Sequence, residues 1–485
     1  MDFSLEEPTI RDLQAAMSDG EITSRQLTLA FLSRIAELDK AGPKLHAVIE
    51  LNPEAVFIAQ QLDAERSMNR VRGPLHGIPI LLKDNINTGD AMHTSAGSLA
   101  LADSYAPSDA ELVKRLRQAG AVILGKTNMT EWANFMSEGM KNGYSSRGGQ
   151  TLNPYGPGTL DAGGSSTGSA VAVAANFCAA AIGTETSGSI LNPACRNHIV
   201  GIKPTLGLIS RSGIIPITYT QDTAGPLARS VEDAAILLGI LAGSDPRDEA
   251  TLAASACEDI PQDYTPFLKE DGLMGKRIGV NRAYIEELDE EERRMLDGTL
   301  EKMREAGAEI IEGTDLPHIS EDATVLLYEF KSALNRYLSQ LGPQAVRKTL
   351  SDIITFNLQH SDEALRYGQT WLERAEQETS GTLTEAAYWR ARQRDWKAAR
   401  EDGIDRLIAE HQLDVILCPG VTDSPAVAGY PAIMIPVGVR EDGMPFGISL
   451  TASAYSEPLL IEAAYALEQL LPSRRPPVLH TGEDN

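Results

Sequence analysis

Three short segments of the sequence carry residue types that together could perform acyl transfer. Lys83 follows an apolar run, so we expect it at the end of a buried strand, where loss of solvation disfavours the ammonium and lowers the lysine pKa. A neutral lysine can accept a proton from a serine. Ser165 and Ser189 each lie in a turn rich in glycine and serine, and the stretch Thr186–Ser189 comes just after a strand-like run, so its backbone amides can point at one oxygen. Taken singly, each segment also fits an ordinary structural role, a snorkelling lysine or a plain loop.

Two other motifs compete with these segments. Residues 120–127 match the phosphate-loop pattern, but the residues between the two glycines look like a strand, whereas a phosphate loop needs flexible residues there. Residues 164–168 match the nucleophile elbow with Ser166 at its centre, yet the segment before them is rich in Gly and Pro and does not favour the strand that an elbow follows. No neighbouring pattern marks a catalytic base among the downstream histidines, which are His198, His318, His360, His411 and His480.

Two helices are predicted from residues typical of helix starts and ends. The first is expected to begin at a Ser24 cap and to end at Gly42. Its apolar residues at helical spacing are Leu27, Phe31, Ile35 and Leu38. The second is expected after the capping-box pattern Ser-Asp-Ala-Glu at 108–111, with Gly120 at the position of a left-handed C-cap.

Short β-rich runs alternate with helical patterns from about residue 45 to 255, which is typical of buried parallel strands. The expected strands lie within 77–82, 121–124, 180–182, 199–202, 415–417, 432–435 and 446–450. Between about 285 and 410 the sequence is charged and favours helices, and a last helix is expected near 458–471. The pattern predicts one large α/β unit interrupted by a helical insertion.

Composition and charge exclude several classes of protein. Of 485 residues, 42% are hydrophobic and 23% are charged, so the chain is neither disordered nor collagen-like. The net charge of −25 disfavours nucleic acids and anionic membranes as partners. The most apolar stretch, residues 169–183, is shorter than the roughly 20 residues that span a bilayer, and is expected to be a buried helix running into a strand.

Cysteine spacing and the first residues give two further expectations. Cys178, Cys195, Cys257 and Cys418 show no C-x-x-C spacing, so neither a disulfide framework nor a zinc site is expected. The first residues lack a basic stretch followed by an apolar one, so the expected compartment is the cytoplasm.

The joint pattern resembles the amidase signature family of Ser-Ser-Lys hydrolases over essentially the whole chain. Residues 163–194 resemble the family's signature, and Ser189 lies 24 residues after Ser165, which is the family's interval. Matches to residues 73–79 and 428–432 lie outside the signature. Within the family the chain looks most like bacterial peptide amidases, on the segments 83–87, 94–98, 131–134, 147–150, 184–186 and 221–225.

The resemblance implies a fold and a domain organisation. The implied fold is α/β, with a large central mixed, mostly parallel β-sheet covered on both sides by α-helices. Residues 1–485 are then a single amidase signature domain, with a signature core at about 60–255 and a mainly helical insertion at about 285–410. The core resumes at 411–475.

The resemblance also assigns roles to residues. Ser189 is the expected nucleophile, Ser165 the bridging serine and Lys83 the base, and the peptide bond before Ser165 is expected to be cis. The backbone amides of the expected oxyanion hole belong to Thr186, Ser187 and Gly188. An acyl-enzyme on Ser189 is implied, and no metal or organic cofactor is.

The implied function is hydrolysis of a linear carboxamide to a carboxylate and ammonia or an amine, with the C-terminal amides of peptides as the expected substrates. Aryl acylamides, small aliphatic amides, and carbamates or esters stay open as alternatives within the family. An alternative of another class is the A subunit of a glutamine-dependent tRNA amidotransferase, which works in a complex. As partners the sequence therefore suggests an amide substrate, and it leaves a monomer or a homo-oligomer open.

Two departures from the family pattern bear on the substrate. Ser187 stands where many members have glycine, and Leu191 stands where the amidotransferases typically have arginine. Neither change removes a backbone amide. In addition, the loop 419–425 looks shorter than in the peptide amidases, which would alter the acyl side of the site.

Overall fold

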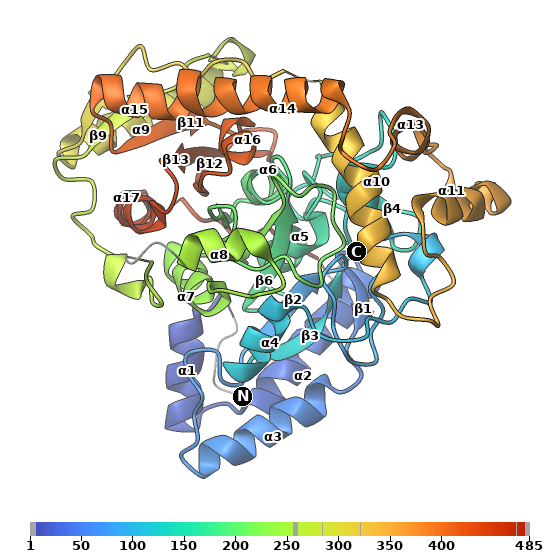
Figure 1. Ribbon diagram of the computed structural model, residues 1–485. Helices are drawn as coiled ribbons and strands as arrows, with labels where there is room; N and C mark the ends of the chain where they lie inside the picture. Colours follow the sequence, from blue (N-terminus) through green and yellow to red (C-terminus); the bar gives the residue numbers. More distant parts are fainter. Residues whose placement is uncertain (1–5, 256–259, 284, 321, 472, 481–485) are drawn as a thin grey trace.

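Within the residues that the computed structural model describes, 6–255, 260–283, 285–320, 322–471 and 473–480, eleven strands form one mixed sheet (Figure 1). Their order across the sheet is β1 (Val48–Leu51), β3 (Val122–Thr127), β2 (Pro79–Lys83), β6 (Ala180–Glu185), β8 (Thr223–Ala228), β7 (Val200–Lys203), β12 (Ala432–Val439), β13 (Pro445–Thr451), β11 (Val415–Pro419), β9 (Arg277–Val280) and β10 (Glu309–Ile311). A small hairpin pairs β4 (Tyr144–Ser145) with β5 (Gly149–Gln150). Each strand expected from the sequence is present.

The directions of the strands differ in part from the expectation. The sheet is mixed, as predicted, but parallel pairing is confined to β3, β2 and β6 and to β11, β9 and β10. The other neighbouring strands pair antiparallel. The expectation of a mostly parallel sheet therefore holds only in these two regions. A continuous apolar run indicates that both faces of a strand are buried, but it does not indicate the direction of the strand.

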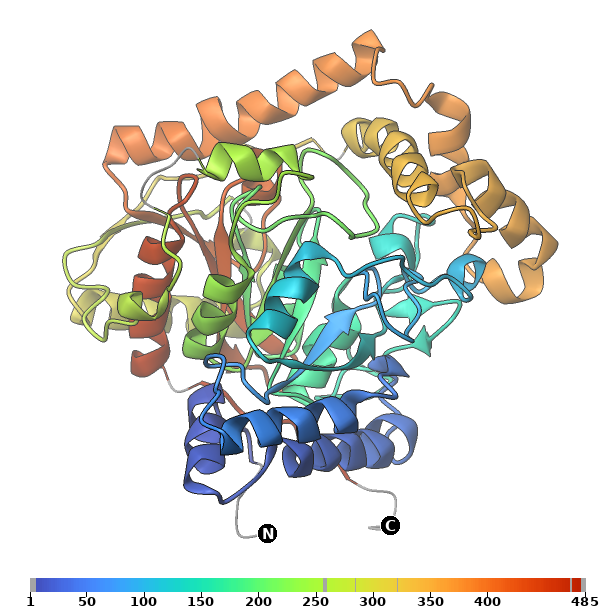
Figure 2. The same cartoon turned by 60° about the horizontal axis from the view of Figure 1, so that its bottom comes forward.

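The α-helices are α1 (Ile10–Asp19), α2 (Ser24–Arg34), α3 (Ala55–Ser67), α4 (Glu111–Gln118), α5 (Thr167–Ala174), α6 (Leu191–Arg196), α7 (Val231–Leu241), α8 (Glu249–Ser255), α9 (Glu290–Glu305), α10 (Thr324–Ser339), α11 (Leu350–Gln359), α12 (Ser361–Ala364), α13 (Thr370–Glu378), α14 (Ala386–Ala399), α15 (Asp405–His411), α16 (Ser424–Ala428) and α17 (Glu457–Leu470). The amino-terminal helices α1, α2 and α3 lie at the opposite end of the molecule from α14 (Figures 1 and 2). No helix in the described ranges is long and apolar enough to cross a membrane.

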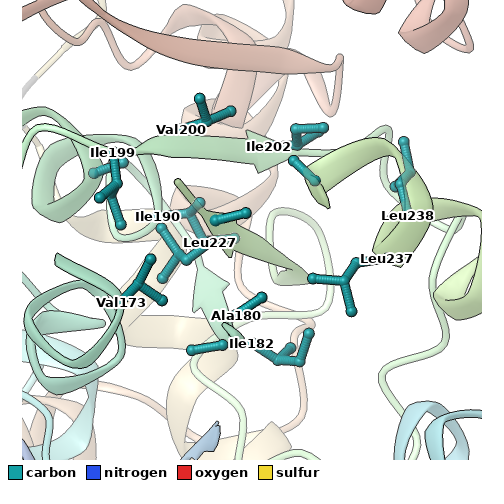
Figure 3. Packing of buried hydrophobic residues seen from close by; sticks show 14 of the residues in the cluster. Val173, Ala180, Ile182, Ile190, Ile199, Val200, Ile202, Leu227, Leu237 and Leu238 are labelled. Atoms are coloured by element: carbon teal, nitrogen blue, oxygen red, sulfur yellow. The ribbon is translucent and has the colours of Figure 1, made fainter. Parts of the chain in front are cut away.

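Helices cover both faces of the sheet, as the resemblance implied. α5 and α6 contact each other and pack on the central strands, while α4, α7 and α17 form a second contacting set. Successive side chains of β7 point to opposite faces: one at Gly201 would point at Ile190 beside α6, so Ile202 points to the other face, and β7 also contacts α7 (Figure 3). Ile190 follows Ser189 directly, and it is buried against Leu227 in this core. The core therefore fixes the chain next to the expected nucleophile.

The range expected to be a helical insertion is not wholly separate from the sheet. α9 follows β9 and leads into β10, the last strand at that edge, so residues 285–311 belong to the α/β layer. A second hydrophobic core begins with α10, where Phe330 packs at 5.0 Å from the ring of Phe135. The ring of Trp371 lies 5.6 Å from the ring of Phe135. Because α9 is rich in charged residues, its sequence did not indicate that it packs on the sheet.

Two predicted helix signals were only partly right. Thr23, not Ser24, caps α2, and a π-helical turn continues it to Lys40, two residues before Gly42. The capping box at 108–111 is wrong, because α4 starts at Glu111 with Ala110 as its N-cap. Main-chain carbonyls of residues 87 and 212 accept hydrogen bonds from the amides of residues 110 and 111, and so replace a side-chain cap. Gly120 does adopt the left-handed conformation, at φ 84°.

Candidate active site

The candidate residues come from three neighbouring elements. Lys83 is the last residue of β2, Ser165 lies in the turn before α5, and Ser189 lies between β6 and α6. β2 and β6 are adjacent parallel strands, so their carboxyl ends meet at one edge of the sheet. Lys83 and Ser165 are fully buried, and Ser189 is 7% exposed. The sequence pattern is thus brought together in space.

The Lys83 amine has three oxygen partners. Nζ lies 2.8 Å from Ser165 Oγ, 2.9 Å from Ser166 Oγ and 3.1 Å from the carbonyl oxygen of Thr184. Ser166 Oγ itself donates to that carbonyl oxygen at 2.9 Å and accepts from the Thr184 amide at 3.2 Å. Because the hydroxyl proton of Ser166 is used in this way, its oxygen accepts from the amine. The two N–H groups of a neutral lysine are then taken by Ser166 and Thr184, and the nitrogen lone pair faces the Ser165 hydroxyl.

Burial controls the protonation of Lys83. Desolvation lowers the pKa of Lys83 to about 7, against the opposing effect of the negative charges of Glu185 and Asp222. An amine with this pKa is largely neutral at slightly alkaline pH and can accept a proton. The expectation of a desolvated lysine at the end of a buried strand is confirmed.

The two serine segments are joined through the main chain. The Ser166 amide donates to the carbonyl oxygen of Ser189 at 3.1 Å, and the Gly164 amide donates to Asn192 Oδ1 at 3.1 Å. Ser165 stands between these two links, and the peptide bond before it is cis, as expected. In the described part of the chain, Lys83 is the one side chain bonded to the Ser165 hydroxyl, and the Ser189 hydroxyl donates no hydrogen bond to a side chain or to a carbonyl. Both protons are therefore available for transfer.

The turn that carries the expected oxyanion amides is held from both sides. Thr186 Oγ1 donates to Asp222 Oδ1 at 2.7 Å, and the Ser187 hydroxyl donates to Asp423. The Asn192 amide donates to the carbonyl oxygen of Gly188 at 2.7 Å, which starts α6. Gly188 has φ 72°, a left-handed conformation that glycine adopts without strain.

Glu185 supports the start of α6 from inside. Its Oε2 accepts from the amides of Ile190 at 2.6 Å and Leu191 at 3.0 Å. Burial raises the pKa of Glu185, and the positive charge of Lys203 opposes this shift. The two residues that follow Ser189 are therefore held by one buried carboxyl group.

A cavity of about 860 Å³ opens beside the turn on the Asp222 side. The segment 214–219 and residues of α10 line it, together with Thr186 of the turn but not Ser189. The cavity provides room for a ligand next to the turn.

The phosphate-loop pattern and the nucleophile-elbow pattern do not form the sites that their sequences suggest. Residues 122–127 form β3, and Lys126 is buried with its amine bound to the Ile86 carbonyl oxygen at 2.6 Å and Thr94 Oγ1 at 2.9 Å, so no phosphate loop exists here. No strand directly precedes the elbow-like sequence around Ser166.

Neither a histidine base nor a metal site emerges from the described residues. Burial lowers the pKa of His198 to about 3. In the described ranges, no group of three His, Cys, Asp or Glu side chains is arranged to hold a metal ion.

The cysteines are unpaired where the structure describes them. Cys178, Cys195 and Cys418 are free and buried, and burial raises the pKa of each thiol. Cys257 lies outside the described residues.

Comparison with known proteins identifies the family. The family model described as Amidase matches residues 26–427. The chain belongs to the amidase family. The "Probable amidase At4g34880" of Arabidopsis thaliana is 42% identical, over 98% of this chain and 92% of the plant protein. The native peptide amidase of Stenotrophomonas maltophilia superposes with a TM-score of 0.92 at 46% identity, covering 98% of this chain and 99% of that one. The A subunit of the glutamyl-tRNA(Gln) amidotransferase of Methylobacillus flagellatus is 34% identical, over 95% and 96% of the two chains.

As an amidase, the protein is a hydrolase of linear amides. The structure adds residues that the sequence did not identify as contacts of Lys83 or as supports of the turn around Ser189. Ser166 contacts the lysine amine, and three carboxyl groups hold the turn around Ser189: Glu185, Asp222 and Asp423. The glycine- and serine-rich pattern identified the segment of Ser166 but not what its hydroxyl contacts. Asp222 and Asp423 are distant in sequence from the turn, and no local pattern points to them.

Proposed function

We propose that this amidase removes the C-terminal amide of peptides, releasing ammonia and the free-acid peptide. The observation that carries the proposal is the likeness to a peptide amidase at 46% identity over nearly both whole chains. The arrangement of Lys83, Ser165 and Ser189 supports the chemistry, and the cavity beside the turn supports a substrate larger than a small aliphatic amide.

In the proposed mechanism, Ser189 Oγ attacks the amide carbon. Its proton moves to Ser165 Oγ while the proton of Ser165 moves to neutral Lys83, so charge never builds up on a free alkoxide. Ser166 and Thr184 hold the two N–H groups of Lys83 and thereby aim its lone pair at Ser165. Ser166 acts here as a positioning residue.

The tetrahedral intermediate carries a negative oxygen, which the backbone amides of Thr186, Ser187 and Gly188 are proposed to stabilise. When the intermediate collapses, the carbon–nitrogen bond breaks and Ser165 returns the proton from Lys83 to the leaving nitrogen. Ammonia leaves, and the acyl group remains as an ester on Ser189. Water then attacks this ester through the same proton relay and releases the carboxylate.

The test is ammonia release by the purified chain from a peptide with an amidated C-terminus, beside a short aliphatic amide and an anilide. The expected result is rapid release from the peptide amide, with the free-acid peptide as product and no internal cleavage. Ser189→Ala should abolish release, while Ser67→Ala, an exposed serine on α3, is the matched control and should retain full activity. Turnover of only the small amide or the anilide would overturn the peptide substrate and keep the hydrolase.

The amidotransferase is a second candidate function, because its A subunits are relatives at 34% identity over most of both chains. Leu191 stands where their arginine is typical, and the net charge of −25 disfavours tRNA as a free partner. Activity of the purified chain alone decides between the two functions, since an amidotransferase chain works only in a complex. An inactive chain that gains glutamine-dependent activity only with partner subunits would favour this second function.

A further inference from the structure

Two departures from the family pattern meet in the structure. The hydroxyl of Ser187 donates a hydrogen bond to the carboxylate of Asp423, which belongs to the loop 419–425. A Cβ atom at Gly188 would lie 3.4 Å from Val421 Cγ1 of the same loop. The loop therefore lies directly against residues 187 and 188, two of the proposed oxyanion residues.

The position of this loop is fixed at both ends. The Gly420 amide donates to the carbonyl oxygen of Gly447 at 3.0 Å, and Ser449 Oγ donates to the carbonyl oxygen of Gly420 at 2.7 Å. At the other end, the Val427 amide donates to the carbonyl oxygen of Asp423 at 3.0 Å as α16 begins. With both ends held on the core, the side chain of Asp423 has a defined place beside the turn.

The charge of Asp423 is not neutralised nearby. Within the described ranges, no Lys, Arg or His side chain lies within 4 Å of its carboxylate, and the residue is exposed. Of the other two carboxyl groups at the turn, Glu185 is buried, and Asp222 is partly exposed and accepts hydrogen bonds from Thr186 and Thr218 as well as from the Ile217 amide. Asp423 is thus the most exposed carboxyl group at this turn, and its side chain accepts a hydrogen bond from Ser187 alone among the described residues.

We propose that Asp423 is a specificity-determining residue that favours peptide amides with a cationic side chain next to the scissile amide and disfavours acidic ones. The inference rests on the proposed function. When the leaving group is ammonia, the rest of the substrate lies on the acyl side, so any substrate charge near the turn belongs to the last residues of the peptide. A carboxylate bound to Ser187, two residues before the nucleophile, attracts a cation there and repels an anion.

The test compares kcat/KM for three amidated peptides that differ only in a C-terminal Arg, Gln or Glu. We expect the order Arg, Gln, Glu, with a ratio of about 10 between Arg and Glu at low ionic strength and a smaller ratio in about 0.5 M salt. Asp423→Asn keeps an acceptor for Ser187 and removes the charge, so the ratio should fall to about 1. Asp423→Lys should invert it.

Asp19→Asn is the matched control, because it changes the net charge by the same amount at the exposed end of α1. Its ratio should equal that of the unchanged protein. An Asp423→Asn variant that slows all three peptides equally and keeps the ratio would assign Asp423 a purely structural role and overturn the inference. If the Gln peptide is hydrolysed but the three rates are equal in the unchanged protein, the inference fails while the proposed function stands. If none of the three is hydrolysed, the proposed function itself fails.

Discussion

Two neighbouring strands carry a buried lysine at or next to their last residue, and the two lysines lie on opposite faces of the sheet. In the register of β2 and β3, Lys83 pairs with Thr127 and Leu82 pairs with Lys126. The two lysine side chains therefore point to opposite faces of the sheet. Both are fully buried, and burial lowers the pKa of Lys83 to about 7 and that of Lys126 to about 8.

Their surroundings differ in kind. Lys83 contacts two serine hydroxyls in front of α5, one of which has a free proton to transfer. Lys126 binds a carbonyl oxygen and the hydroxyl of Thr94, and lies near the negative charge of Asp84. The comparison teaches that desolvation lowers the pKa of both amines toward neutrality, and that the partners of each amine decide between a proton relay and a structural support.

The largest effect is expected for Lys83→Met, which removes the base and retains an apolar side chain of similar length. kcat/KM for the amide substrate should fall by at least about 10³-fold, because the proton of Ser165 loses its acceptor. The circular dichroism spectrum should match that of the unchanged protein. A variant that keeps a tenth of the activity would assign the base to another group.

The pH dependence sharpens the comparison of the two lysines. Only the neutral form of Lys83 accepts a proton, so kcat/KM should rise with pH, level off above a pKa of about 7, and increase about 50-fold between pH 5 and pH 7. The profile should keep this inflection in Lys126→Met. An inflection that disappears with Lys126, or a rate that is flat over this range, contradicts the assignment of Lys83 as the base.

A smaller effect is expected for Ser166→Ala, which leaves Lys83 in place but removes one of the acceptors that orient it. kcat should fall about 10-fold with little change in KM, and the apparent pKa of the pH profile should fall, because the ammonium form loses a hydrogen bond. Ser169→Ala is the matched control: its buried hydroxyl contacts Thr127 and the carbonyl oxygen of Ile182 rather than the amine. Equal profiles for the two variants would show that Ser166 is only structural.

The smallest effect on catalysis is expected for Lys126→Met. The substitution leaves the Ile86 carbonyl oxygen and the Thr94 hydroxyl without their buried donor, so the free energy of unfolding should fall by about 1–3 kcal/mol. The rate per folded molecule should change by less than about tenfold. Denaturant unfolding and kcat, measured on the same preparation, separate the two quantities. A loss of kcat as large as that of Lys83→Met would make the two lysines one functional unit.

Much of the site could be predicted because its signals are local. Burial of Lys83 follows from the apolar residues before it, and the turns of Ser165 and Ser189 follow from their glycines. The strands that bring these segments together were likewise visible as apolar runs. These features depend on residues that are neighbours in the sequence.

What the sequence did not reveal depends on contacts between distant segments. The amides at the start of α4 are bound by carbonyl groups of residues 87 and 212, so the capping-box pattern there is not used. The pairing of Ser187 with Asp423 joins residues 236 positions apart. Strand direction and the packing of α9 on the sheet are also set by tertiary structure, which local propensity and charge pattern do not encode.

The most direct test of the proton-relay account is to locate the acyl group during turnover. The enzyme is mixed with an amidated peptide, quenched in acid within the first turnovers, digested and mapped by mass spectrometry. The account predicts an acyl ester on Ser189, and none on Ser165 or Ser166. An acyl group on either of those two serines, or the absence of any acyl-enzyme while ammonia is released in a burst, would contradict it.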